Sequence, residues 1–109
     1  MWYSMRTAAL AMLLVAGPVV SARAADADHG AALARQWCAG CHAIGGSDAV
    51  RADIPPSFAS IARRPGTSED TLRAWLATPH PSMPDFDLSR SALADLTAYI
   101  LSLAPRRTE

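Results

Sequence analysis

Three residues in this chain stand out for their chemistry, two cysteines and a histidine arranged as C-x-x-C-H at positions 38 to 42. Two thiols at this spacing can each add across one vinyl group of a porphyrin. The adjacent imidazole can then bind the iron from one side. Cys38, Cys41 and His42 therefore predict one covalently attached haem c, with His42 as an axial ligand of its iron.

Two other uses of this cysteine pair compete with haem attachment. A disulfide across two intervening residues is typical of thioredoxin-like proteins, where it stands beside a βαβ pattern, and no such pattern is visible here. A zinc site needs further ligands at metal spacing, and only His29, His42 and His80 could give them. Haem attachment explains both cysteines and the adjacent histidine together. It also agrees with the export signal that the first 24 residues resemble.

The first 24 residues have the pattern of a secretory signal peptide. Arg6 precedes an almost unbroken apolar stretch over 7–20, and Ala22-Arg23-Ala24 offers a small-x-small cleavage pattern. An uncleaved membrane anchor is the alternative, but these 14 residues are short against the about 20 that span a bilayer. We expect cleavage after Ala24, a periplasmic location and no transmembrane segment in the mature chain, residues 25–109.

The mature chain has the size of one small domain. A domain of this size buries only about 60% of its unfolded surface, and a haem would add a large apolar plate to its core. Its eight arginines stand against ten acidic residues, which gives a formal charge of about −2, and the chain has no lysine. This balance gives no electrostatic case for nucleic acid binding. A haem can exchange electrons with a partner protein that docks near its edge. We expect this docking surface to be largely apolar, and the rate of electron exchange to depend only modestly on ionic strength.

Met83 is the residue we expect on the other side of the iron. It is the one methionine that remains after residue 24, and it lies in a loop between Pro81 and Pro84. A thioether is a soft ligand, and methionine–histidine ligation is typical of cytochromes c. A lone methionine can also simply fill core space. His80, in the same loop, and His29 are rival ligands.

The segments that hold these residues in place are predicted to be helices. Apolar residues recur at helical spacing, without useful β-alternation, in segments separated by proline- and glycine-rich loops. The expected helices cover 28–37, 57–64, 67–78 and 89–104. Asp28, Thr67 and Ser89 are the expected amino-terminal caps of the first, third and fourth of these helices.

Taken together, these features resemble the class I c-type cytochromes, in particular the short, exported bacterial kind with one haem. The similarity covers essentially the whole mature chain. It rests on the C-x-x-C-H motif, on Pro56-Ser57-Phe58 after the haem loop, on the proline-flanked Met83 and on a last helix with Tyr99. The resemblance implies a small all-α cytochrome c fold, in which three to four helices and loops surround one haem.

The resemblance also implies roles for other residues. The carbonyl of Pro56 matches the position that accepts a hydrogen bond from the proximal histidine. The first and last helices should cross closely, which sets Gly30 and Ala34 against Tyr99. Trp75 matches an aromatic that often faces a haem propionate, although it could equally be ordinary core. Any of three arginines could offset propionate charge: Arg63, Arg64 and Arg73.

The function expected on these grounds is electron transfer without catalysis. With His42 and Met83 as axial ligands, a monomeric periplasmic carrier would exchange one electron with redox partner proteins of unknown identity. One alternative is a haem-bearing subunit of a periplasmic dehydrogenase or oxidase. Another is a haem enzyme or gas sensor, which needs an open iron position and is disfavoured by Met83.

Overall fold

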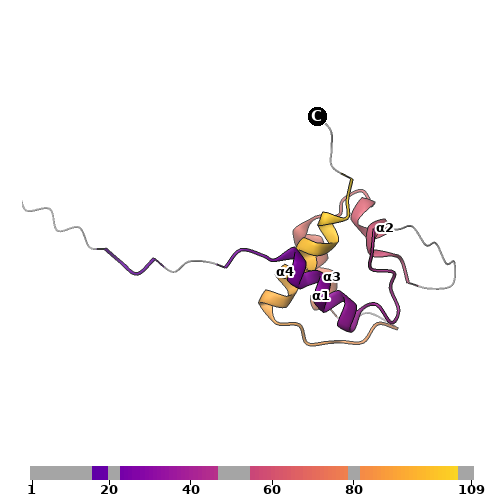
Figure 1. Cartoon of the computed structure of the whole chain (residues 1–109), viewed down its shortest axis with the longest axis horizontal. Helices are drawn as coiled ribbons and strands as arrows, with labels where there is room; N and C mark the ends of the chain where they lie inside the picture. Colours follow the sequence, from indigo (N-terminus) through magenta and orange to yellow (C-terminus); the bar gives the residue numbers. More distant parts are fainter. Residues whose placement is uncertain (1–15, 20–22, 47–54, 79–81, 106–109) are drawn as a thin grey trace, which may run out of the picture.

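The computed structural model describes residues 16–19, 23–46, 55–78 and 82–105, and within these ranges the chain is helical without strands. The all-α fold predicted from the sequence is therefore confirmed. The helices follow one another along the chain as shown in Figure 1: α1 (Ala27–Trp37), α2 (Phe58–Arg63), α3 (Glu69–Ala77) and α4 (Arg90–Ser102). None of these described helices has the length and apolar character needed to cross a membrane.

Helix α4 organises the domain because it contacts each of the other three described helices. Its crossing with α1 is close enough to exclude a side chain at Gly30, where a Cβ would collide with the backbone carbonyl of Asp95. The same Cβ would come within 2.9 Å of Cβ of Tyr99. Ala34, one turn further along α1, is fully buried. The predicted contact between the first helix and the Tyr99 region is thus present.

The helix starts agree with the sequence prediction at α4 and differ by one or two residues at α1 and α3. Ser89 caps α4 as expected, accepting a hydrogen bond from the backbone N–H of Ala92. Asp26, not Asp28, caps α1, since its carboxylate accepts from the N–H of His29.

Ser68, not Thr67, caps α3, in a capping box with Thr71. The Thr67 hydroxyl instead donates to the carbonyl of Ile61 at 2.8 Å, which ties the start of α3 to the end of α2. Several neighbouring Asp, Ser and Thr residues can cap equally well in a sequence, and such tertiary bonds decide among them.

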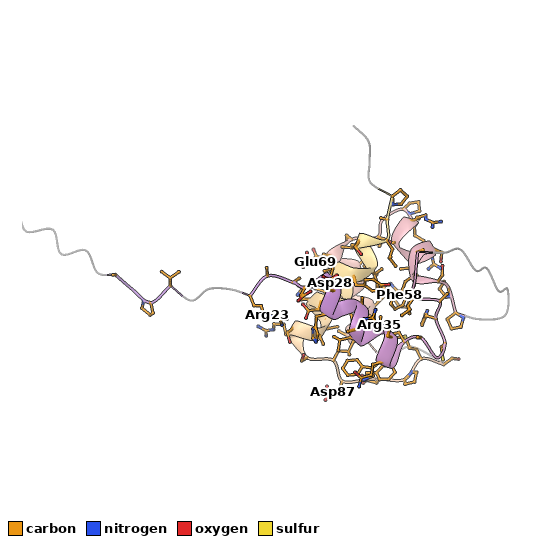
Figure 2. The ribbon with its side chains drawn as sticks, viewed as in Figure 1. Arg23, Asp28, Arg35, Phe58, Glu69 and Asp87 are labelled. Carbon is orange, nitrogen blue, oxygen red and sulfur yellow. The ribbon has the colours of Figure 1, made fainter. Side chains whose placement is uncertain are left out.

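The core combines apolar side chains from all four described helices with one buried carboxylate. Leu33, Phe58, Leu72 and Leu96 belong to this cluster, while charged side chains such as Asp28 and Arg35 stay outside it (Figure 2). The carboxylate is that of Asp95, which lies where α1 meets α4.

Asp95 is 1% exposed, and three groups surround its carboxylate. It accepts from the N–H of Asp26 at 2.8 Å and lies 2.6 Å from Nδ1 of His29. The exposed guanidinium of Arg23 lies 3.4 Å away. These hydrogen bonds, led by the one from Asp26, hold the pKa of Asp95 below its usual range despite burial. A buried carboxylate with such partners fixes the position of the start of α1 on α4.

Candidate functional site

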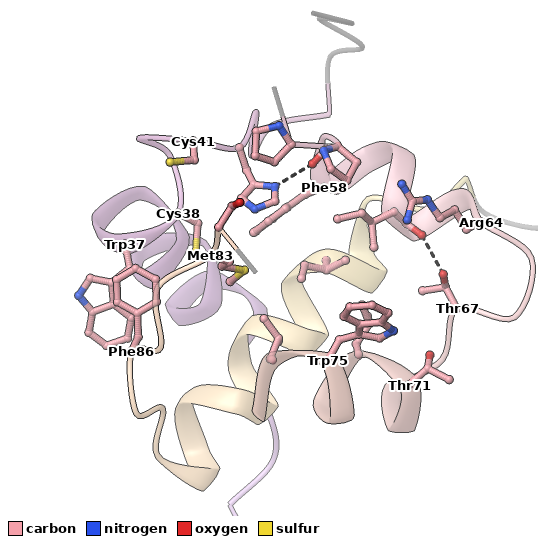
Figure 3. Close-up of a pocket in the computed structure, with 18 of the residues that line it drawn as sticks. Trp37, Cys38, Cys41, Phe58, Arg64, Thr67, Thr71, Trp75, Met83 and Phe86 are labelled. Carbon is pink, nitrogen blue, oxygen red and sulfur yellow. Dashed lines mark hydrogen bonds between the residues drawn. The ribbon is translucent and has the colours of Figure 1, made fainter. Parts of the chain in front are cut away.

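A cavity of about 610 Å³ opens beside α4, bounded by α2, α3, the end of α1 and the loop after residue 81. Its volume falls within the roughly 300–1,000 Å³ typical of cofactor and ligand pockets. Apolar side chains dominate its surface. They include Phe58, which is labelled in Figure 3, and also Leu72, Leu76 and Ile100. The cavity therefore suits a large apolar group with a few fixed polar contacts.

Both cysteines line this cavity as free thiols. Cys38 is the buried C-cap of α1, and Cys41 follows in an exposed turn. Burial raises the pKa of the Cys38 thiol. Reactive thiolates are instead stabilised at helix amino termini, where the helix dipole is positive. The position of Cys38 thus argues against the thioredoxin-like alternative.

His42 lines the same cavity in one defined orientation. Its Nδ1 lies 2.8 Å from the carbonyl oxygen of Pro56, drawn as a dashed line in Figure 3. A carbonyl can only accept, so Nδ1 carries the proton and donates it. The other ring nitrogen, Nε2, then keeps its lone pair for a metal. This is the bond that the resemblance implied for Pro56.

Neighbouring groups hold the His42 segment against the core. The ring of Phe58 lies 5.3 Å from the imidazole, centroid to centroid. The backbone N–H of Phe58 donates to the carbonyl of Ala43 at 2.9 Å. Tyr99 donates its hydroxyl hydrogen to the carbonyl of Ile44 at 2.6 Å. Because these contacts come from α2 and α4, the imidazole is positioned by the whole fold and not by the motif alone.

Met83 is half-buried and lines the cavity together with Cys38, Cys41 and His42. It does not belong to the packed core cluster, which disfavours the alternative of a simple core filler. The rival ligand His29 is engaged with Asp95 at the α1–α4 crossing instead. The other rival, His80, lies outside the described residues, as does Pro81.

The far end of the cavity from the cysteines is more polar. Figure 3 shows Arg64, Thr67, Thr71 and Trp75 on this side. Trp75 is 63% exposed and does not belong to the core cluster of the described residues.

The structure also separates the three arginines considered for the propionates. Arg64 lines the cavity, whereas Arg73 pairs with Glu69 on α3 at 2.7 Å. Arg63 is not among the lining residues, although it takes part in other interactions.

Two aromatic lining residues were missed by the sequence analysis. Trp37, the last residue of α1, stacks on Phe86 from the Met83 loop. The C-x-x-C-H motif could have suggested Trp37, since Trp37 directly precedes the first cysteine of that motif. Nothing local indicates Phe86, because its partner lies 49 positions away and only folding brings the two together.

The described helices and loops surround one large apolar cavity. Both thiols and the imidazole of the C-x-x-C-H motif lie on its surface. This arrangement defines a c-type cytochrome. Comparison with known proteins agrees. Residues 25–100 match the family model described as cytochrome c oxidase, cbb3-type, subunit III. Cytochrome c-552 of Bradyrhizobium diazoefficiens is 52% identical over 94 residues, which cover 86% of this chain and 90% of the relative. No solved structure matches significantly.

The chain therefore belongs to the c-type cytochrome family and is an electron-transfer haem protein with covalently bound haem c. The residues present fit this cofactor: the cavity has a suitable volume and apolar surface, and the thiols are free. His42, whose Nε2 keeps its lone pair, and Met83, with its thioether, line the same cavity.

Proposed function

We propose that residues 25–109 form an exported, monomeric carrier of single electrons in the periplasm, without catalytic activity. The observation that carries the proposal is the convergence of Cys38, Cys41, His42 and Met83 on one apolar cavity. Cleavage after Ala24 is supported by the family match, which begins at residue 25. Docking of redox partner proteins near the cavity would complete the transfer.

In this proposal Cys38 and Cys41 hold the haem c through thioether bonds, and His42 and Met83 bind its iron. When bound, haem c supplies a metal centre that gains and loses one electron. Pro56 keeps the proton on Nδ1 of His42 and fixes the plane of its ring, which also raises the basicity of the ligating nitrogen. Met83 has no proton to exchange, so its ligation does not depend on its own titration.

The remaining lining residues adjust charge and water access. Apolar side chains such as Phe58 and Leu72 exclude water and disfavour extra positive charge, which favours the reduced state. Arg64 and the indole N–H of Trp75 lie at the polar end and would face the propionates. With His42 and Met83 both bound to the metal, small substrates would find no open site there, and this supports a carrier rather than an enzyme.

The test is Met83→Ala in the mature holoprotein. We expect a folded protein that still carries haem but gains carbon monoxide binding and has a lower potential, because a soft ligand favouring ferrous iron is lost. Optical spectra and redox titration of wild type, Met83→Ala and His80→Ala measure this. If Met83→Ala keeps the wild-type spectrum while His80→Ala changes it, His80 is the distal ligand.

A second candidate is an electron-transfer subunit of a periplasmic oxidase or dehydrogenase complex. The name of the matching family model, an oxidase subunit, favours it. The relative that this chain covers almost completely is named simply as a cytochrome c-552, which supports a free carrier. Purification from periplasm separates the two: a subunit would elute with its complex, and a carrier would elute alone.

A further inference from the structure

The loop that carries Met83 has an unusual backbone. Among the described residues, the two non-glycine positions with positive φ are Ser82, at 73°, and Asp87, at 48°, and they bracket the segment from Met83 to Phe86. The N–H of Asp87 donates to the carboxylate of Asp85 at 3.0 Å. Such left-handed conformations are uncommon outside glycine and persist where surrounding contacts hold them. The loop therefore needs an anchor.

The stack of Phe86 on Trp37 provides one. Their ring centroids lie 6.2 Å apart with an interplanar angle of 13°, and Figure 3 shows the two rings side by side at the edge of the cavity. Trp37 is half-buried and packed against the core cluster, whereas Phe86 is 38% exposed. One ring thus belongs to the fixed end of α1, and the other to the loop.

The sequence positions of this pair matter for the metal site. Trp37 directly precedes Cys38, and Phe86 follows Met83 by three residues. The stack therefore connects the helix end that bears the first attachment cysteine to the loop that bears the thioether. A thioether would compete poorly with an added nitrogen ligand once it could move away from the iron, so exchange of Met83 would depend on how firmly this loop is held.

We propose that Trp37 and Phe86 are a positioning pair, which keeps the Met83 loop closed over the cavity and limits displacement of Met83 by an added ligand. This inference rests on the proposed ligation by Met83. In the exchange, the bond between iron and the Met83 sulfur breaks and a bond to the entering nitrogen forms. No electron or proton is transferred between them.

The experiment is an optical titration of the ferric holoprotein with imidazole, together with urea unfolding of the same samples. Phe86→Ala and Trp37→Ala should each increase imidazole affinity about tenfold, which corresponds to about 1.4 kcal/mol and is in the range expected for an aromatic pair. Phe86→Tyr keeps the ring and should stay within about twofold of wild type. Phe86→Leu replaces Phe86→Ala if the latter yields too little protein.

Two controls separate positioning from general destabilisation. Ser68→Ala removes the cap of α3 at a residue that does not line the cavity, and should lower the urea midpoint without changing imidazole affinity. The double variant Trp37→Ala/Phe86→Ala should bind imidazole no more tightly than either single variant, because removing one ring already abolishes the stack.

The outcomes distinguish this inference from the proposed function. If Met83→Ala changes the spectrum but Phe86→Ala and Trp37→Ala bind imidazole like wild type, the positioning role is wrong and the ligation stands. Independent, multiplicative effects of the two ring deletions would also overturn it, since the rings would not act as a pair. If Met83→Ala leaves the spectrum unchanged, the ligation fails and this inference fails with it.

Discussion

The two sides of α4 are built in opposite ways. Toward α1, the helices approach so closely that Gly30 has no room for a Cβ, and the carboxylate of Asp95 is fully engaged by backbone and side-chain partners. Toward α2 and α3, Ile100 and Leu72 belong to the core cluster but also line a cavity of about 610 Å³. One side is closed by the chain itself, and the other side is shaped for a haem.

This difference indicates where the stability of the protein resides. The α1–α4 crossing depends on contacts within the polypeptide, so it should form whether or not the haem is attached. The cavity side leaves much apolar surface for the haem to cover, and a domain this small has little stability to spare. We therefore expect the two sides to respond differently to substitutions.

The largest expected effect is on the cavity side, in the double variant Cys38→Ala/Cys41→Ala. Without thioether bonds, the yield of protein with haem should fall sharply, because attachment and ligation normally support each other. In the remaining haem-free chain, amide hydrogen exchange should show protection in α1 and α4 and little in α2 and α3.

Acid and organic solvent should leave the haem on the wild-type chain and extract whatever haem the double variant retains. Free extraction from the wild type would contradict the covalent attachment. Protection of α2 and α3 equal to that in the wild-type holoprotein, in a chain without haem, would contradict the contrast between the two sides.

The second prediction concerns the crossing side, through Gly30→Ala. Alanine is the better helix former by about 1 kcal/mol, but its Cβ would collide with the backbone of Asp95, which cannot rotate away. We expect a net loss of about 2 kcal/mol in the free energy of unfolding, or a decrease in Tm of about 8–16 °C. Thermal unfolding of the holoprotein measures it.

Gly46→Ala is the matched control, since a Cβ at Gly46 would meet no atom within 4 Å and the position lacks a positive φ. Its Tm should stay near that of wild type. Equal stability of both alanine variants would show that the helices separate at little cost, and the crossing would then not be the rigid side of the molecule.

The smallest of the three effects is expected for Asp95→Asn, which keeps the shape of the side chain but removes its charge. Loss of the charge-assisted hydrogen bonds that Asp95 accepts from Asp26 and His29 should cost about 1–1.5 kcal/mol at neutral pH, because the amide oxygen of Asn can still accept the bond from Asp26. Folding lowers the pKa of Asp95. Its contribution is therefore complete above the ordinary carboxyl pKa of about 3.9, and is lost as the pH falls through the lower pKa of the folded state.

Urea unfolding of the wild type and of Asp95→Asn at several pH values measures this difference, which should shrink toward zero in acid. Asp28→Asn removes an exposed carboxylate from the same part of α1 and should cost less than about 1 kcal/mol. A difference between wild type and Asp95→Asn that stays constant down to strong acid would show that the charge of Asp95 does not stabilise the crossing.

Much of this protein could be predicted from the sequence. The apolar spacing predicted four helices within one or two residues at their starts, and Cys38, Cys41, His42 and Met83 were identified as one candidate site. The helix prediction succeeds because helical periodicity is a local property of the chain. The C-x-x-C-H spacing is local too, and the four candidate site residues line one cavity. The resemblance to c-type cytochromes added the partner of His42, Pro56, and the structure contains that hydrogen bond.

Contacts between distant segments could be known only once the chain was folded. Asp95 looks like a polar position on the last helix, and its burial follows from the close approach that Gly30 allows. Phe86 gains its role from Trp37, and of the three candidate arginines only Arg64 lines the cavity. A side chain's neighbours across the fold depend on how helices pack, and this information is spread over the whole sequence instead of residing in any motif.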